Sequence, residues 1–521
     1  MKKILFTIAL SLLIVSCHDD DVLTNIDQEG SFPKNSYSIP VDSALNYLYE
    51  FINEPSSNSS ARVVSKRVVK SLIPIKLNGN KASLINNGKM FLSSQENSND
   101  DENLVYIANF DNDQGYAILA ADKRIGENVI AITDAGSLSD STVYSALELL
   151  NSERIILDEY PKTGPGFFTM PETGDELFLN PNTVTLYDDK EKDTLVGFYS
   201  FDNEGEEDEN GNLIPQDQTS NLEPEALTSA MCVSYAMNKI KGFTEQEEFQ
   251  NDPNDGTGNP YTKKYIVSAW EIKKSVSPMF TQFKEWRQNS PFNDLCPKRR
   301  KYVLVGHKRR APAGCFPLAI SKIMTYFEHP KNFVYNGYKV DWKELKKSVE
   351  TDIGKNSAAH LLRSVGSSCD SWYFYNGTFT FPHKATSYMR HIGFTNAHSY
   401  SYKFDRVTNM LDNGKPVIIY SVPGINIFKS HCWNIDGYKV KERTVTTNIY
   451  FGSTIINTTN RTETVKMVHC DFGWKGRCNG YYVSGVFKLN DSNVEHDPGT
   501  PYGGSTNYNN LLKVITYDIN I

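Results

Sequence analysis

The chain has 521 residues, of which 39% are apolar, 12% aromatic and 22% charged. This composition is that of an ordinary globular protein, and it excludes wholesale disorder, a collagen-like chain and a coiled coil. At about 100–200 residues per domain, the length predicts two to four domains. No apolar run of about 20 residues follows the first 17 residues, so we expect no membrane-spanning helix there.

The formal net charge of −8 conceals two halves of opposite charge. Residues 18–225 contain 38 acidic and 14 basic residues, whereas residues 226–521 contain 24 acidic and 38 basic residues. A uniformly basic chain would suggest nucleic acid as a partner, but here the basic half has an acidic partner in the same chain, so we expect no nucleic acid. This difference in charge fits two unrelated domains. It also fits two domains that attract each other through their opposite charges and whose later separation serves the function.

The first residues in chain order have the layout of an export signal. Lys2 and Lys3 precede the apolar run 4–15, which is too short to span a bilayer. Ser16 then stands directly before Cys17, an arrangement that resembles the lipobox of bacterial lipoproteins, and residues 18–21 resemble the acidic tag of surface lipoproteins. We therefore expect an outer-membrane lipoprotein, lipidated at Cys17, exposed at the cell surface and released from it after maturation. The alternative is a plain secretion signal with an incidental cysteine.

The rest of the first half predicts an acidic domain followed by a linker. Residues 17–34 are polar and suit a tether. Strands are expected over 105–110, 116–121 and 129–133, and a helix over 141–160. Residues 201–272 are strongly acidic around 204–209, which predicts an exposed linker suited to cleavage, although residues 223–241 have the pattern of an amphipathic helix.

The second half, from residue 273, is denser in aromatic residues and predicts helices before strands. A helix is expected after Cys315, with apolar residues from Ala319 to Phe327 on one face. Strands are expected over 416–422, 432–440 and 480–489. This order predicts an α+β domain.

Cysteine usage argues against a metal site. Seven cysteines follow Cys17, and none forms a Cys-x2-Cys pair, nor does any His-x3-His pair occur. We therefore predict no metal and no cofactor. An odd number of cysteines outside the cytoplasm leaves at least one thiol unpaired, and which cysteines pair is left open.

Cys315 is the candidate for the unpaired thiol. Gly314 permits a tight turn, and Pro317 is tolerated only in the first turn of a helix, so a helix should begin close to Cys315. A thiol at the N-terminus of a helix has its nucleophilic thiolate form favoured by the helix dipole. The alternative is a disulfide or a buried structural thiol.

A thiolate nucleophile needs an imidazole nearby to hold the ion pair and return a proton. The chain has 10 histidines. His431 stands at the start of an expected strand, after a turn-rich segment, and His469 is the rival base. A single histidine on a strand is commonly a hydrogen-bonded core residue.

Together these residues resemble the streptopain family of papain-like cysteine peptidases. The resemblance covers residues 273–521 well and 35–200 weakly, where Gly115–Asp122 and Ile132–Leu138 resemble the family's propeptide. Its blocks in the second half are Trp286-x-Gln288-x-x-Pro291-Phe292-Asn293, Gly314-Cys315 with Ala319-Ile320-x-x-Ile323-Met324-x-Tyr326 and Pro330, His431-x-Trp433-x-Ile435-Asp436-Gly437-Tyr438, and Gly473-Trp474-x-Gly476 followed by Asn479-Gly480-Tyr481-Tyr482.

The resemblance implies a papain-like fold, in which a helical part faces a twisted antiparallel sheet, and a role for each matched residue. Cys315 matches the nucleophile and His431 the general base and acid, which favours it over His469. Gln288 matches the glutamine that forms the oxyanion hole with the backbone N–H of Cys315, and Trp474 matches the indole wall of the site.

Three features depart from the family pattern. Phe316-Pro317 stand where the family has small residues. Asp471 takes the place of the asparagine that orients the imidazole, a role that a carboxylate can also perform. Basic residues at 298–301 and 308–310 precede the nucleophile, and they fit either a solvated loop or a contact for an acidic propeptide or substrate.

These observations predict a surface-anchored cysteine endopeptidase made as a proenzyme. The expected segments are a signal peptide (1–16), a lipidated tether (17–34), an acidic propeptide domain (35–200), an acidic linker and activation region (201–272) and the catalytic domain (273–521). Its partners would be polypeptide substrates, its own propeptide and, through a lipid anchor, a membrane. A catalytically inactive binding lipoprotein and a papain-like amidase or acyltransferase are the alternatives.

Overall fold

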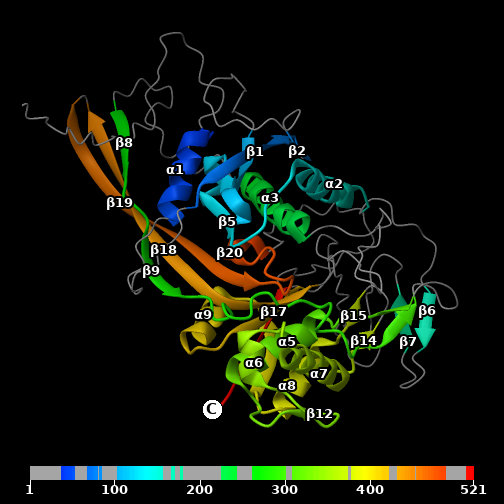
Figure 1. Cartoon of the computed structure of the whole chain (residues 1–521). Coiled ribbons are helices and arrows are strands. Elements are labelled where there is room, and N and C mark those ends of the chain that lie inside the picture. Colours follow the sequence, from blue (N-terminus) through cyan, green and yellow to red (C-terminus); the bar gives the residue numbers. More distant parts are fainter. Residues whose placement is uncertain are drawn as a thin grey trace, which may run out of the picture.

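The structure is a computed structural model (Figure 1), and it describes residues 37–52, 67–79, 81–84, 103–156, 166–169, 176–179, 224–242, 261–300, 308–373, 377–421, 431–451, 453–487 and 512–520. The predicted signal peptide, the whole tether with Cys17, and the acidic run at 204–209 lie outside these residues. Within them, no helix has the length and apolar character needed to cross a membrane.

The N-terminal part is an antiparallel sheet flanked by helices (Figure 1). Every residue of the strands β3, β4 and β5 of this sheet is buried, because α1 packs on β4 and β5 while α3 packs on β3 and β4. Its elements are α1 (Val41–Ile52), β1 (Val69–Asn78), β2 (Lys81–Leu84), β3 (Asn103–Phe110), η2 (Asp111–Asp113), β4 (Tyr116–Ala120), η3 (Lys123–Ile125), β5 (Val129–Thr133), α2 (Asp140–Ile156) and α3 (Pro224–Gly242), with a separate hairpin of β6 (Gly166–Thr169) and β7 (Glu176–Leu179).

The C-terminal part begins with a helical layer around helix α5 (Cys315–Phe327). Eleven of the thirteen residues of α5 are buried, because it packs against the sheet strand β18 on one side and other helices on the other. The remaining elements are α6 (Trp342–Lys347), α7 (Asp352–Ser368) and α8 (Pro382–His391), with the hairpins β10 (Lys298–Arg300)–β11 (Lys308–Arg310), β12 (Val334–Tyr335)–β13 (Tyr338–Lys339) and β14 (Trp372–Tyr373)–β15 (Thr378–Phe379).

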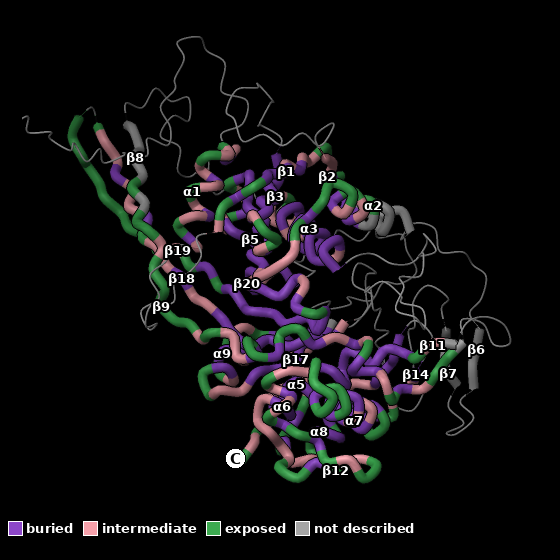
Figure 2. Tube along the Cα trace, in the orientation of Figure 1, coloured by how far each residue is buried: buried purple, intermediate pink, exposed green. Residues whose placement is uncertain are grey.

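An antiparallel sheet faces these helices. Two long strands, β18 and β19, form its centre, and their far ends extend away from the body as a hairpin in which β19 is exposed and β18 is mostly half-buried (Figure 2). The elements are β8 (Tyr261–Val267), β9 (Glu271–Val276), β16 (Thr395–Ser401), α9 (Phe404–Asp412), β17 (Val417–Ser421), β18 (Cys432–Phe451), β19 (Thr454–Asp471), β20 (Gly480–Val483), η4 (Ser484–Phe487) and β21 (Leu512–Asp518).

The two parts share one continuous sheet. Its order is β16-β21-β17-β18-β19-β20-β5-β4-β3-β1-β2, with β8 and β9 also paired to β18. The joint is the pairing of β20 with β5, in which Gly480 lies opposite Thr133. A side chain at residue 480 would not fit, because its Cβ would lie 2.3 Å from the carbonyl oxygen of Ile132.

The predicted α+β class, with a helical part facing an antiparallel sheet, is confirmed. The strands expected at 105–110, 116–121 and 129–133 and the helices expected at 141–160 and 223–241 are present as β3, β4, β5, α2 and α3. The strand expected at 480–489 ends earlier, at Val483, where η4 begins.

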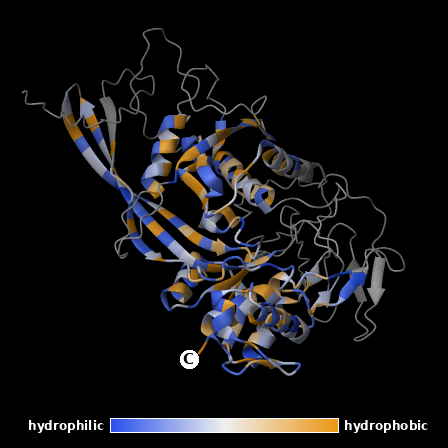
Figure 3. Cartoon of the chain, in the orientation of Figure 1, coloured by the Kyte–Doolittle hydropathy of each residue, from blue (hydrophilic) through white to orange (hydrophobic). Residues whose placement is uncertain are grey.

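Two expectations about exposed segments need correction. Residues 201–272, expected to be a linker and activation region apart from the helix at 223–241, also include β8, which pairs with β18. The basic run at 298–310 is not simply a loop, since residues 298–300 and 308–310 form a hydrophilic hairpin (Figure 3) in which Lys298 lies opposite Arg310. Like charges directly opposite each other destabilise such a pair of strands.

The close approach at Gly480 predicts that a Gly480→Ala substitution loosens the joint between the two parts. Backbone hydrogen exchange at residues 131–133 should become about tenfold faster, which corresponds to about 1.4 kcal/mol. The measurement is hydrogen exchange by mass spectrometry on the full chain. Gly79→Ala, in the open turn between β1 and β2, is the control, and equal exchange in the two variants would contradict the prediction.

Candidate active site

The turn before α5 places Cys315 at the N-terminus of that helix, as predicted. Gly314 has φ +99°, a backbone conformation that favours glycine, and a Cβ at this position would lie 2.9 Å from Thr378 Cγ2. Pro317 occupies the first turn of the helix, where a missing N–H costs no hydrogen bond. The Cys315 thiol is therefore held at the positive end of the helix dipole.

His431 meets Cys315 from the sheet. It immediately precedes β18, and its side chain forms a hydrogen bond with the thiol of Cys315. The Nε2 atom of His431 lies 2.9 Å from the carbonyl oxygen of Phe472. Because a carbonyl oxygen only accepts, Nε2 carries the proton and donates it, which leaves Nδ1 for the sulfur.

Trp474 fixes the plane of the imidazole. The two rings stack with centroids 4.5 Å apart and planes 17° apart. Phe472 continues the stack on Trp474, at 5.0 Å. The predicted indole wall is thus the surface on which the ring of His431 rests.

The surroundings of Cys315 favour its thiolate. Burial alone raises the pKa of the thiol, but hydrogen bonds from the side chains of Cys432 and His431, together with the charge of His431, lower this pKa to about 5. At neutral pH the group is then an anion next to an imidazole, which is the nucleophilic state of a cysteine.

Gln288 is buried in the loop that pairs with the segment before Cys315. The backbone of its loop is tied to the segment before the cysteine, because Ala313 N donates to Gln288 O at 2.8 Å. The same loop is tied to the tryptophan side by Lys475 N, which donates to Trp286 O at 3.1 Å. The loop therefore lies between the elements that carry Cys315 and Trp474.

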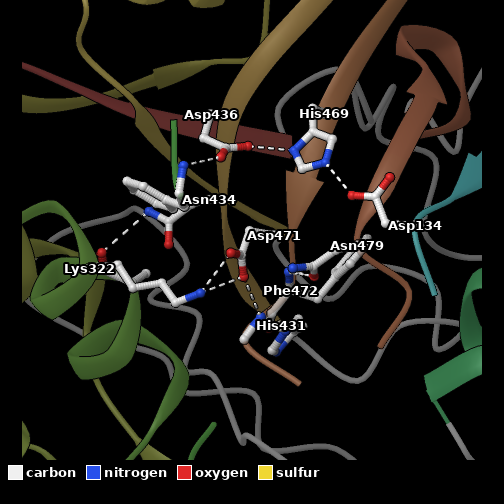
Figure 4. A network of polar contacts seen from close by, with 12 residues as sticks. Asp134, Lys322, His431, Asn434, Asp436, His469, Asp471, Phe472 and Asn479 are labelled. Carbon is white, nitrogen blue, oxygen red and sulfur yellow. Dashed lines mark hydrogen bonds and ion pairs between the residues drawn. The ribbon is translucent and has the colours of Figure 1, made fainter. Parts of the chain in front are cut away.

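Asp471 does not have the orienting position that the sequence predicted. Its carboxylate accepts two hydrogen bonds from Lys322 Nζ, both 2.7 Å long, and one from Gly473 N (Figure 4). Burial raises the pKa of Asp471, and the charge of Lys322 works against that rise. The acceptor for His431 is instead the backbone carbonyl of the next residue, Phe472.

This buried ion pair nevertheless supports the histidine indirectly. Lys322 lies in α5, two turns after Cys315, and both charged side chains are 1% exposed. The pair and the Gly473 N–H fix the start of the turn, while Phe472 N donates to Asn479 Oδ1 at 3.0 Å. The carbonyl that holds His431 is thereby held in place between α5 and the end of β19.

The rival base His469 lies in a different network (Figure 4). Its Nδ1 is 2.6 Å from Asp436 Oδ1, and its Nε2 is 3.1 Å from Asp134 Oδ2. Burial lowers the pKa of His469, but the two carboxylates outweigh this and raise it to about 10. His469 is thus a cation that joins the two parts of the chain and has no nitrogen left for a thiol.

Other contacts of the N-terminal part surround the turn that carries Trp474. Glu225, at the start of α3, binds the guanidinium of Arg477 with its two oxygens, one of them at 2.7 Å. Thr228 donates to the thiol of Cys478 at 3.5 Å. The ion pairs of Glu225 with Arg477 and of Asp134 with His469 each have the acidic group in the N-terminal part and the basic group in the C-terminal part, as the charge split predicts.

Lys322 and Asp134 are site residues that the sequence patterns did not predict. Lys322 could have been found, because a lysine in the middle of a mostly apolar helix is expected to need a counter-charge if it is buried. Asp134 could not, since its role depends on how two distant segments dock. The seven cysteines within the described residues are all free thiols, so Cys432 and Cys470 are not paired with Cys478.

The buried ion pair predicts that Lys322→Met lowers the free energy of unfolding by about 3–5 kcal/mol, because it leaves the carboxylate of Asp471 unpaired. Adding Asp471→Asn should recover most of the lost free energy of unfolding. All six tryptophans lie between residues 270 and 474, so urea unfolding followed by tryptophan fluorescence reports on the C-terminal part.

Lys346→Met is the matched control for this prediction. It removes an ion pair with Glu328 that is partly exposed, so it should cost less than about 1 kcal/mol. All chains carry Cys315→Ala, so that the reactive thiol is absent from every protein compared. Equal losses for the two lysine variants would contradict a structural role for the ion pair.

Both parts of the chain match models of known protein families. Residues 286–482 match the model of the peptidase C10 family, and residues 36–154 match the Spi protease inhibitor model. No curated protein sequence matches the chain.

Two similar solved structures come from Prevotella intermedia. One is a fragment of prointerpain A, with 14% identity and a TM-score of 0.39, covering 80% of this chain and 96% of that one. The other is the active interpain A cysteine protease, with 19% identity and a TM-score of 0.32, covering 48% of this chain and 97% of that one. The two sequence models identify residues 286–482 as a domain of the peptidase C10, or streptopain, type of cysteine peptidase and residues 36–154 as a Spi-type inhibitor domain, which is the order of a cysteine peptidase preceded by its propeptide.

Proposed function

We propose that this protein is a secreted, surface-anchored endopeptidase in which Cys315 is the nucleophile and His431 the general base and acid. The observation that carries the proposal is the hydrogen bond between the thiol of Cys315, at the N-terminus of α5, and the imidazole of His431. The other imidazole nitrogen of His431 is held by Phe472 O, which fixes the tautomer that this chemistry needs.

The reaction follows from these positions. The thiolate of Cys315 attacks the carbonyl carbon of a peptide bond, and His431 donates its Nδ1 proton to the leaving amine. An acyl-enzyme remains. His431 then removes a proton from water, which attacks the thioester and releases the acid and the thiol.

Gln288 is proposed to stabilise the oxyanion together with the backbone N–H of Cys315. Two fixed donors suit the charge that develops on the carbonyl oxygen, and the loss of one such donor typically lowers the rate by about 100–1,000-fold. The backbone bonds from Ala313 N to Gln288 O and from Lys475 N to Trp286 O support this role, because they tie the Gln288 loop to the segments that carry Cys315 and Trp474.

The N-terminal part is proposed to restrain the site through the turn at 473–479. Its contacts, Glu225 with Arg477, Thr228 with Cys478 and β5 with β20, all lie on or directly after this turn. Maturation then requires a cut between α3, which packs on the N-terminal part, and β8, which pairs with β18 and stays with the mature enzyme.

Export and anchoring are proposed from the sequence. Lys2, Lys3 and the apolar run that follows suit a signal peptide, and Cys17 suits lipidation at the outer membrane. A cut after α3 would release the catalytic part from such an anchor. Cys17→Ala should abolish incorporation of labelled fatty acid and leave the protein soluble, and lipid labelling of that variant would contradict lipidation at Cys17.

The catalytic proposal predicts that Cys315→Ala abolishes peptide hydrolysis and prevents loss of the N-terminal part. Purified full-length wild-type and variant chains are compared by gel electrophoresis over time and by hydrolysis of a casein-like substrate. Cys369→Ala, which removes another buried thiol, is the control and should behave as the wild type.

Other results of these experiments would indicate a different route of maturation or a different function. Equal processing of the wild type and of Cys315→Ala rules out self-processing through this thiol. An unreactive Cys315 without maturation indicates a binding lipoprotein on the same fold, whereas a reactive Cys315 without protein hydrolysis indicates an amidase or acyltransferase. Labelling with an epoxide inhibitor of papain-like enzymes separates these two cases.

The interface predicts that Asp134→Asn speeds loss of the N-terminal part several-fold at neutral pH, because His469 loses one of its two carboxylates. The measurement is the rate of self-processing. Asp140→Asn, an exposed substitution at the start of α2, is the control and should have no effect.

The same interface predicts a pH dependence of docking. Asp134 contributes to the raised pKa of His469, so docking is favoured while His469 is protonated and weakens as the pH rises through about 10. Cys315→Ala chains cut between α3 and β8 by an added protease are passed over a size-exclusion column between pH 7 and 10.5. Unchanged co-elution of the two parts across this range would contradict the prediction.

A further inference from the structure

We propose that Cys432 is a resolving cysteine for Cys315, so that a hydroperoxide such as hydrogen peroxide converts the active-site thiol reversibly into a Cys315–Cys432 disulfide. The inference uses Cys315 as the nucleophile of the proposed function. Formation of the bond, however, can be observed without any peptidase activity.

The two cysteines lie in the same buried cluster. Cys432 directly follows His431 and begins β18, and its side chain and its backbone each form a hydrogen bond with the thiol of Cys315. Both residues are buried, at 2% and 1% exposed. The two thiols therefore lie in one buried cluster, where the N-terminus of α5 packs against the start of β18.

Other cysteines near the site have different partners. The thiol of Cys470 lies 3.4 Å from Trp433 Nε1, and that of Cys478 lies 3.5 Å from Thr228 Oγ1. All seven cysteines within the described residues are reduced in this structure. Cys432 is therefore the thiol that is positioned to react with an oxidised Cys315.

The environments of the two thiols suit the two roles. Cys315 is the group with the lowered pKa, and thiolates react with hydroperoxides. Burial and the hydrogen bond and negative charge of Cys315 keep the pKa of Cys432 well above its usual range, so Cys432 remains a thiol and a donor. Oxidation of Cys315 to a neutral group removes the part of this effect that comes from its charge.

The first step forms a sulfenic acid. The sulfur anion of Cys315 attacks one oxygen of hydrogen peroxide, so that an S–O bond forms and the O–O bond breaks. The leaving hydroxide takes a proton and becomes water. Cys315 is oxidised by two electrons and the peroxide is reduced by two.

The second step closes the bond. Cys432 gives up its proton, its sulfur attacks the sulfur of the sulfenic acid, and the S–O bond breaks as water leaves with that proton. In total, two thiols and one hydrogen peroxide give one disulfide and two molecules of water. A thiol reductant reverses the change, and the disulfide keeps Cys315 from reaching the irreversible sulfinic acid.

The test compares the matured wild type, Cys432→Ala and Cys369→Ala after the same treatment with hydrogen peroxide. Activity is measured before oxidation, after oxidation and after dithiothreitol, and each protein is normalised to its own starting activity. Wild type and Cys369→Ala should recover nearly all of it. Cys432→Ala should recover about tenfold less, because its Cys315 proceeds to sulfinic acid. Equal recovery in Cys432→Ala would overturn the proposal.

Peptide mapping of the oxidised full-length wild type tests the bond directly. Under non-reducing conditions, mass spectrometry should find the peptides of Cys315 and Cys432 joined, with a mass two hydrogens lower than their sum. Sulfinic acid at Cys315 without this joined peptide would overturn the proposal, even if Cys432→Ala fails to fold. Joined peptides in a chain that lacks peptidase activity would instead support this inference while contradicting the proposed function.

Discussion

The contact between the sulfur of Cys315 and the imidazole of His431 is the interaction on which the rest of the site depends. Neither residue can be moved independently, because one begins a buried helix and the other precedes a central strand. Their meeting therefore requires the packing of α5 on β18. Correct placement of reacting groups is worth several kcal/mol of a reaction barrier, so small shifts of this helix against the sheet should matter for catalysis.

The ion pair of Lys322 with Asp471 crosses the same helix–sheet boundary. An aspartate at the family's asparagine position would be an isolated buried charge without the lysine of α5, and the lysine would be equally unfavourable alone. Together the two charges fix the turn whose backbone carbonyl accepts from His431. The carboxylate therefore supports the imidazole through the main chain rather than by direct contact.

Much of this arrangement could be predicted from residues that are close in the sequence. Gly314 and Pro317 specify where α5 begins, and the continuous apolar runs of β3, β4 and β5 predict strands that are buried on both faces. The contact of Cys315 with His431 was predicted only through family resemblance, because more than a hundred residues separate them. The partner of Asp471, the ion bridge through His469 and the β20–β5 joint depend on packing between distant segments, which local patterns do not encode.

The shared sheet has a consequence for the mature enzyme. In the full chain β20 has a strand on each side, β19 and β5, and its backbone groups toward β5 are satisfied by pairing. When the N-terminal part is removed, β20 becomes an edge strand whose N–H and C=O groups on that side are unpaired. Activation thus exposes a sheet edge directly beyond the turn that carries Trp474. An extended polypeptide of matching shape can pair with this edge as an additional strand.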